Sequence, residues 1–114
     1  MVETNSYVPR RGDVVWISLS PQAGREQAGR RPALVLSPDA YNAKVGLALL
    51  CAVTSQVKGY PFEVAVPEGL AVAGVVLSDH VRSLDWRARK AEWACTLPLS
   101  ATAEVLAKLQ ALLR

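Results

Sequence analysis

The sequence predicts a mainly β fold with α structure, a small barrel or half-barrel of five to six bent strands followed by a C-terminal helix. Short apolar runs alternate with turn residues along most of the chain, as in small all-β barrels. Only the segment after Pro98 spaces its apolar residues as an amphipathic helix does. With 114 residues the chain has the usual length of one domain, so residues 1–114 are expected to form a single domain.

Six segments are expected to contain the strands, because each is apolar and is bounded by Gly, Pro, Asn, Asp or Ser. They lie within residues 13–19, 31–37, 45–55, 61–67, 73–86 and 93–98. The fourth segment alternates strictly, which predicts one buried face formed by Phe62, Val64 and Val66.

The connections and the C-terminus carry other patterns. The sequences SPDAYNA (residues 37–43) and VKGYP (residues 57–61) have the composition of turns. Ser100 is expected to be the N-cap of the final helix. The apolar stripe of this helix is expected to pack on the sheet or on a partner subunit, and it consists of Val105, Leu106, Leu109, Leu112 and Leu113.

Composition limits the classes of function. Hydrophobic residues make up 51% of the chain and charged residues 20%, which excludes a disordered protein. The net charge of +3 is compatible with an anionic partner. Cys51 and Cys95 show no CxxC spacing and are expected to be reduced thiols of a cytoplasmic protein. No apolar run approaches the ~18 residues that cross a membrane, and with His80 as the single histidine we expect neither a metal nor a cofactor.

Arg30 and Arg31 stand directly before the second apolar strand, with Pro32 between the guanidinium groups and the apolar run. One interpretation is a polar turn that enters a strand. The other is that the strand mounts an arginine rigidly, because the planar guanidinium binds phosphate through two parallel hydrogen bonds.

Longer motifs bear on this choice. The patterns GxEQxGxRPxxVLS (residues 24–37), KGYPFEV (58–64) and DxxRSxDWxxR (79–89) occur in this order. In combination they resemble the MazF/PemK family of bacterial toxin endoribonucleases, and the match to MazF-type members is close. The resemblance implies an SH3-like β-barrel of the CcdB/PemK type, a homodimer, and a cognate acidic, MazE-like antitoxin. It also implies metal-independent cleavage of single-stranded RNA at short motifs, which leaves a 2′,3′-cyclic phosphate and a 5′-hydroxyl.

The resemblance also implies roles for individual residues. Arg31 matches an arginine that meets the scissile phosphate, and it is also a candidate proton donor. Thr54 matches a position whose hydroxyl contributes to the site. Glu26 is the candidate general base and Asp79 is its rival, since some PemK-type members use an aspartate there together with an arginine two residues earlier. Leu77 occupies that earlier position here, which favours Arg31 as the working cation.

Further residues are candidates for RNA contacts, namely Arg25, Gln27, Arg30, Gln56, Lys58, His80, Arg82 and Arg87. Gln56 and Lys58 are candidates for reading base edges, and His80 for a peripheral contact with RNA or at an interface. Arg82, Arg87 and Arg89 interleave cations with an aromatic residue, which suits single-stranded nucleic acid. Trp86, which lies among the last of these, is either a stacking platform or a core residue.

Two other functions are compatible with the same fold. A CcdB-like toxin would bind DNA gyrase and would not need Arg31 or Thr54, but the helix ends in KLQALLR without an aromatic anchor. A catalytically inactive barrel would bind RNA without cutting it.

Overall fold

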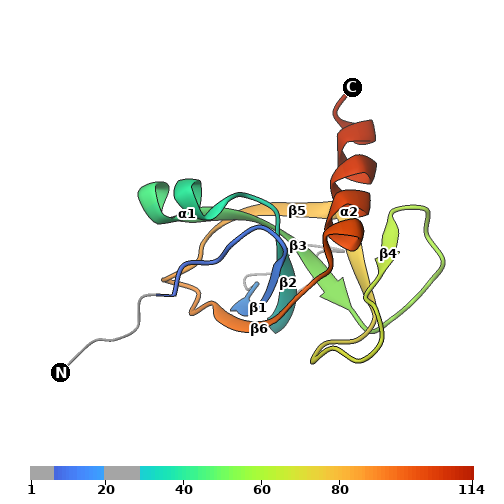
Figure 1. The fold of residues 1–114 in the computed structure, drawn as a ribbon, viewed down its shortest axis with the longest axis horizontal. Coiled ribbons are helices and arrows are strands. Elements are labelled where there is room, and N and C mark those ends of the chain that lie inside the picture. Colours follow the sequence, from blue (N-terminus) through green and yellow to red (C-terminus); the bar gives the residue numbers. More distant parts are fainter. Residues whose placement is uncertain (1–6, 20–28) are drawn as a thin grey trace.

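The computed structural model describes residues 7–19 and 29–114 (Figure 1). Within this part of the chain, six strands and two helices follow one another. They are β1 (Asp13–Ser18), β2 (Arg30–Val35), α1 (Asp39–Val45), β3 (Leu47–Thr54), β4 (Glu63–Ala65), β5 (Val75–Asp85), β6 (Glu92–Thr96) and α2 (Leu99–Leu112). The mainly β fold with a C-terminal helix is therefore confirmed, and each predicted strand segment contains a strand or most of one.

The strands of the described residues form one antiparallel sheet in the order β4-β5-β3-β2-β1-β6 (Figure 1). The expected barrel is not closed, because β4 and β6 are the two edges of an open sheet. β3 lies inside the sheet and is paired on both sides, with β2 and with β5. The pairing with β5 extends to the last residue of β3, because Thr54 lies opposite Val75.

The sheet has apolar side chains on both faces, which is why its strands read as continuous apolar runs. Neighbouring residues of one strand belong to different clusters: Val14 and Leu34 pack in the cluster that α2 covers, and Val15 and Val35 pack in the other. Val64 and Val66 are buried as predicted, while Phe62 is half-buried.

The segment predicted as a turn after β2 is instead the helix α1. Its seven residues are too few for helical periodicity to be read from the sequence. Asn42 shows why the helix forms here, because its fully buried side chain donates to the carbonyls of Pro9 (2.8 Å) and Ser37 (3.1 Å). The Asn42 carbonyl also accepts a hydrogen bond from the indole of Trp86 at 3.0 Å. Gly46 ends the helix at a φ of 83°.

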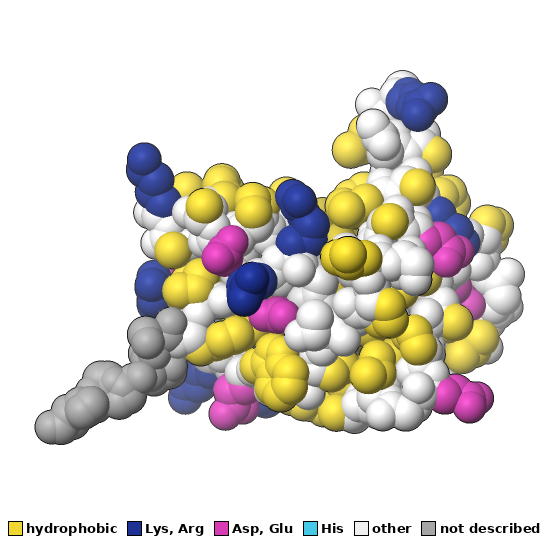
Figure 2. All heavy atoms as spheres, in the orientation of Figure 1, with side chains coloured by type: hydrophobic (Ala, Val, Ile, Leu, Met, Phe, Trp, Pro, Cys, Tyr) yellow, Lys and Arg dark blue, Asp and Glu magenta, His cyan; other side chains and the backbone are white. Residues whose placement is uncertain are grey.

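The final helix begins at Leu99, with Pro98 as its N-cap, so the prediction that Ser100 caps it is wrong. The ring of Pro98 fixes the backbone angle φ at the start of the helix, and no side chain caps the helix there. Val105 is fully buried against the sheet, but Leu113 is 75% exposed. Hydrophobic side chains are accordingly visible along the projecting part of α2 (Figure 2). The described residues include no helix that is both long enough and apolar enough to cross a membrane.

Gly74 allows its own segment to pack closely against the backbone of Thr54 and Ser55 at the end of β3. A Cβ at this position would lie 2.1 Å from the carbonyl oxygen of Thr54 and 2.9 Å from Cα of Ser55. Its φ of +119° also disfavours any side chain. The backbone of Thr54 can therefore lie where it does only because residue 74 is glycine.

We predict that Gly74→Ala lowers the free energy of unfolding by about 2–4 kcal/mol, since the added methyl group forces the backbone of Thr54 or of residue 74 to move. Gly69→Ala is the matched control, because Gly69 also has positive φ (+92°) but open space around it. The control should lose only about 1 kcal/mol. Urea unfolding of the three proteins measures both values, and equal losses in the two variants would contradict the packing account.

Candidate active site

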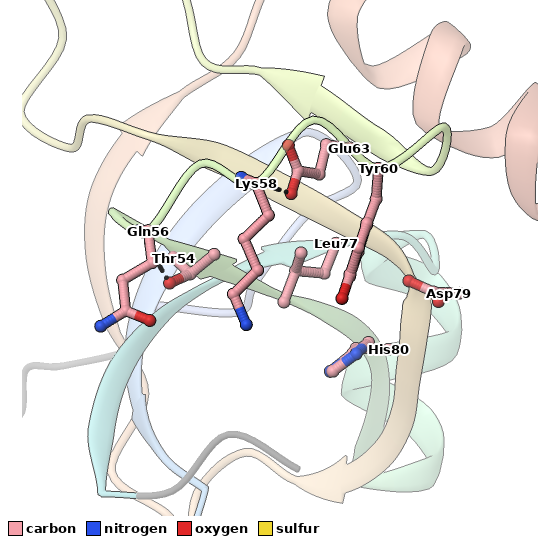
Figure 3. A pocket seen from close by; sticks show the side chains of 8 residues that line it. All are labelled: Thr54, Gln56, Lys58, Tyr60, Glu63, Leu77, Asp79 and His80. Carbon is pink, nitrogen blue, oxygen red and sulfur yellow. Dashed lines mark hydrogen bonds between the residues drawn. The ribbon is translucent and has the colours of Figure 1, made fainter. Parts of the chain in front are cut away.

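A pocket of about 410 Å³ opens where β3 ends and the chain turns toward β4 (Figure 3). Its walls come from the end of β3, from the loop of residues 55–62, from the start of β4 and from β5. The lining residues are Thr54, Gln56, Lys58, Tyr60, Glu63, Leu77, Asp79 and His80. Five of these are residues that the sequence singled out, and the fold brings them together from two separate segments.

Thr54 lies at the base of the pocket, where β3 leaves the sheet. It is 5% exposed, and its Oγ1 accepts a hydrogen bond from the backbone N–H of Gln56 at 3.1 Å (Figure 3). A hydroxyl that accepts one hydrogen bond still has its own proton to donate. The side chain is thus fixed in direction and can serve as a donor to an oxygen in the pocket.

Lys58 supplies the cation that reaches into this space (Figure 3). Among residues 7–19 and 29–114, its ammonium group forms no salt bridge or hydrogen bond. Glu63 also lines the pocket, but its two carboxylate oxygens accept the backbone N–H groups of Lys58 (3.1 Å) and Gly59 (3.0 Å). The carboxylate of Glu63 is therefore engaged with the loop, while the charge of Lys58 stays available.

Asp79 and His80 approach the pocket from β5. The charge of Asp79 acts on Cys51: burial first, and then the negative charge of Asp79, raise the pKa of the Cys51 thiol to about 12. Cys51 and Cys95 are both buried free thiols, so Cys51 is protonated at neutral pH and is not a nucleophile. The wall of the pocket therefore carries two basic side chains, Lys58 and His80, and two carboxylates, Glu63 and Asp79.

Tyr60, Glu63 and Leu77 line the pocket without having been predicted to do so. Tyr60 is 55% exposed, and its ring extends into the pocket (Figure 3). The KGYP sequence could have indicated it, because an aromatic residue beside a lysine in a Gly/Pro loop is an exposed platform on which a base can stack. Nothing in the sequence shows that Glu63 binds backbone N–H groups.

Arg31 is exposed near the start of β2, opposite Ile17 of β1. It is not among the residues that line the pocket. In the antiparallel pairing of β2 with β3, Ala33 lies opposite Ala52. Arg31 lies two residues before Ala33, and Thr54 lies two residues after Ala52, so the same register places Arg31 opposite Thr54. Residues directly opposite each other in antiparallel strands share a face of the sheet. Arg31 and Thr54 therefore belong on one face, at the end of the sheet where the pocket opens.

Two other arginines singled out by the sequence bind the backbone. Arg30 forms a salt bridge with Glu92 (2.5 Å) and donates to the Lys90 carbonyl (2.8 Å). Arg82 donates to the carbonyl of Leu19 at 2.7 Å. Both hold the segments beside the connection between β1 and β2, and neither lines the pocket.

Arg87 lies over the ring of Trp86, with its guanidinium carbon 4.2 Å from the ring centroid. Trp86 itself is 4% exposed. Of the two interpretations of Trp86, the core residue is therefore confirmed.

Glu26, Arg25 and Gln27 lie outside the described residues. Within the described residues, no three His, Cys, Asp or Glu side chains gather as metal ligands would.

Comparison with known proteins agrees with this architecture. The family described as "PemK-like, MazF-like toxin of type II toxin-antitoxin system" matches residues 10–113. The endoribonuclease toxin MazF of Escherichia coli K12 is 53% identical over 85 residues, which are 75% of this chain and 76% of that protein. The endoribonuclease toxin ChpB of the same strain is 37% identical over 117 residues, with 97% of each chain covered.

Solved structures give the same result. A crystal structure of MazF from Deinococcus radiodurans superposes with a TM-score of 0.92 at 59% identity, covering 95% of this chain and 98% of that one. A crystal structure of MazE–MazF from the same organism gives 0.84 at 54% identity, covering 95% and 97%. On the sequence match, the shared fold and these identities, the chain belongs to the PemK/MazF-like family of toxins of type II toxin–antitoxin systems.

Proposed function

We propose that this protein is the toxin of a toxin–antitoxin pair and that it cleaves single-stranded RNA at short sequence motifs. The observation that carries the proposal is the pocket, because two segments that are separate in sequence line one cavity, the first with Thr54, Gln56 and Lys58 and the second with Asp79 and His80. Family membership supports the same activity, since the relatives from Escherichia coli are named endoribonucleases.

The chemistry that fits these residues is attack by the ribose 2′-hydroxyl on the adjacent phosphorus. The O2′–P bond forms, the P–O5′ bond breaks, and the products are a 2′,3′-cyclic phosphate and a 5′-hydroxyl. Arg31 neutralises the charge that builds on the phosphoryl oxygens, and its guanidinium group is the candidate donor of the proton that the leaving 5′-oxygen takes up. The hydroxyl of Thr54 donates to a phosphate oxygen.

The proton of the 2′-hydroxyl passes to a carboxylate, and Glu26 and Asp79 are the two candidates. Asp79 has the support of lining the pocket together with Thr54. Glu26 has the support of the motif that also contains Arg31. No step in this scheme uses a metal ion.

The pocket also suits the parts of RNA that flank the bond to be cut. Lys58 and His80 provide hydrogen-bond donors for phosphates, and Tyr60 provides a surface on which a base can stack. Gln56, which can both donate and accept, is suited to reading a base edge. Such contacts would confer preference for a short motif.

We predict that the purified protein cuts a long single-stranded RNA in the presence of EDTA, and that Arg31→Ala lowers kcat by about 10²–10³-fold because one charged donor to the transition state is lost. Mapping the 5′ ends by sequencing and testing them for a free 5′-hydroxyl measures both the site and the chemistry. Arg10→Ala is the control, since Arg10 is an exposed arginine that does not line the pocket.

Full activity of Arg31→Ala would reject Arg31 as the catalytic cation. Binding of RNA without cleavage in every buffer would instead support an inactive RNA-binding protein. Comparison of Glu26→Gln with Asp79→Asn identifies the base, because only the variant that lacks it should lose cleavage over the whole pH range.

We further propose that the protein acts in the cytoplasm as a homodimer and is inhibited by an acidic, extended antitoxin. The net charge of +3 favours an acidic partner, and the Deinococcus relative was crystallised as a MazE–MazF complex. Exposed apolar side chains such as Trp93 (57%) and Leu99 (89%) support self-association.

Light scattering at micromolar concentration should therefore give twice the mass of the 12.3 kDa chain. A monomer under these conditions would reject the dimer and leave the exposed apolar side chains to the antitoxin.

A further inference from the structure

The loop of residues 55–62, which forms one wall of the pocket, is held mainly by side chains. In the described residues, the backbone N–H groups of Gln56, Lys58 and Gly59 all donate to side-chain oxygens rather than to a neighbouring strand. The only backbone–backbone hydrogen bonds that the described loop makes lie at its far end, through the carbonyls of Tyr60 and Phe62. The position of Lys58 therefore depends on the side chains that the loop contacts.

Glu63 makes two of these contacts. Its oxygen Oε2 lies 3.1 Å from the backbone nitrogen of Lys58 (Figure 3), and Oε1 lies 3.0 Å from that of Gly59, so one carboxylate bridges two successive peptide groups. A carboxylate that accepts two backbone N–H groups holds a turn strongly, because charged hydrogen bonds exceed neutral ones in strength. This use also explains how a pocket suited to phosphate can contain a carboxylate.

Lys108 holds the same loop from the other side and comes from α2. Its ammonium group donates to the carbonyls of Pro61 (2.6 Å) and Glu63 (3.0 Å). Glu104, one helical turn earlier, lies 3.6 Å from the same nitrogen. The side chain of Lys108 is only 30% exposed, so α2 is tied to the pocket wall by a directed, partly buried contact.

We propose that Glu63 and Lys108 are positioning residues that hold the loop of residues 55–62 in the one conformation in which Lys58 reaches over the pocket. Glu63 acts on the N–H groups of Lys58 and Gly59 in the middle of the loop, and Lys108 acts on the carbonyls of Pro61 and Glu63 at its end. Neither residue touches the reacting atoms. The part that concerns RNA rests on the proposed function, whereas the part that concerns the loop does not.

The physical benefit is that the loop is ordered before the substrate binds. A loop that must be ordered on binding loses affinity through the conformational entropy of each residue it fixes. With both contacts in place, this cost is met during folding, and Lys58 is already directed into the space that a phosphate would occupy.

Limited digestion with trypsin tests the loop directly, because trypsin cleaves the bond between Lys58 and Gly59. We expect Lys108→Met and Glu63→Gln to raise the initial rate of cleavage after Lys58 about tenfold, as the loss of contacts of this strength opens the loop. Glu104→Gln should leave the rate unchanged, since it removes the ion pair but keeps both hydrogen bonds of Lys108. Cleavage after Lys44 in α1, followed by mass spectrometry in the same samples, reports any general loosening of the fold.

Kinetics with a short RNA substrate test the connection to Lys58. Lys108→Met should raise KM about tenfold with kcat within about twofold of wild type, and Lys108→Arg should restore most of the loss. In a Lys58→Ala background, Lys108→Met should change KM no further, because the residue through which it acts is absent.

The outcomes are distinguishable. An unchanged rate of cleavage after Lys58 in both positioning variants would overturn the proposal, as would fully additive effects of Lys108→Met and Lys58→Ala on KM. If the wild-type protein cleaves no RNA, the proposed function fails, and the digestion experiment still decides whether Glu63 and Lys108 hold the loop.

Discussion

The pairing of β3 with a neighbour on each side determines where the pocket of this protein lies. β2 and β5 fix β3 in the sheet, and Thr54 is the last residue of that strand. After Thr54 the N–H groups of Gln56, Lys58 and Gly59 find their hydrogen-bond partners in side chains and not in a neighbouring strand. The chain therefore turns away from the sheet and leaves the pocket. Gly74 allows this turn, since no larger residue fits against the Thr54 carbonyl. The pocket is therefore a consequence of where the central strand stops.

The charges around the pocket follow from the same arrangement. Both oxygens of Glu63 are occupied by the N–H groups of the loop, whereas Lys58 has no counter-ion among the described residues. Lys108 draws the loop toward α2. The helix that covers one face of the core thus also supports the loop that forms one wall of the pocket.

Much of the fold could be predicted from the sequence, because apolar runs separated by Gly and Pro define strands wherever the strands are buried. The open edges of the sheet could not be predicted, because the sequence of an edge strand does not show whether that strand pairs with the opposite edge to close a barrel. The helix α1 was missed because seven residues show no periodicity, and Asn42 in it binds groups that come from other parts of the chain.

For the site, the motif residues Thr54, Gln56, Lys58, Asp79 and His80 could be selected from their pattern. Their neighbours Glu63 and Lys108 could not, because their roles depend on contacts with the backbone of a loop. Trp86 illustrates the same limit, because its sequence context suited base stacking as well as it suited the core, and the structure places it in the core.

On the proposed function, RNA binds in the pocket at the end of β3. The most direct test is an NMR titration of the ¹⁵N-labelled protein with single-stranded oligonucleotides that lack the 2′-hydroxyl and cannot be cut. We expect amide shifts to concentrate in residues 54–60 and 77–80, while the amides of α1 stay unchanged. Shifts confined to α1 or to the turn between β5 and β6, with the pocket amides unmoved, would contradict binding in the pocket.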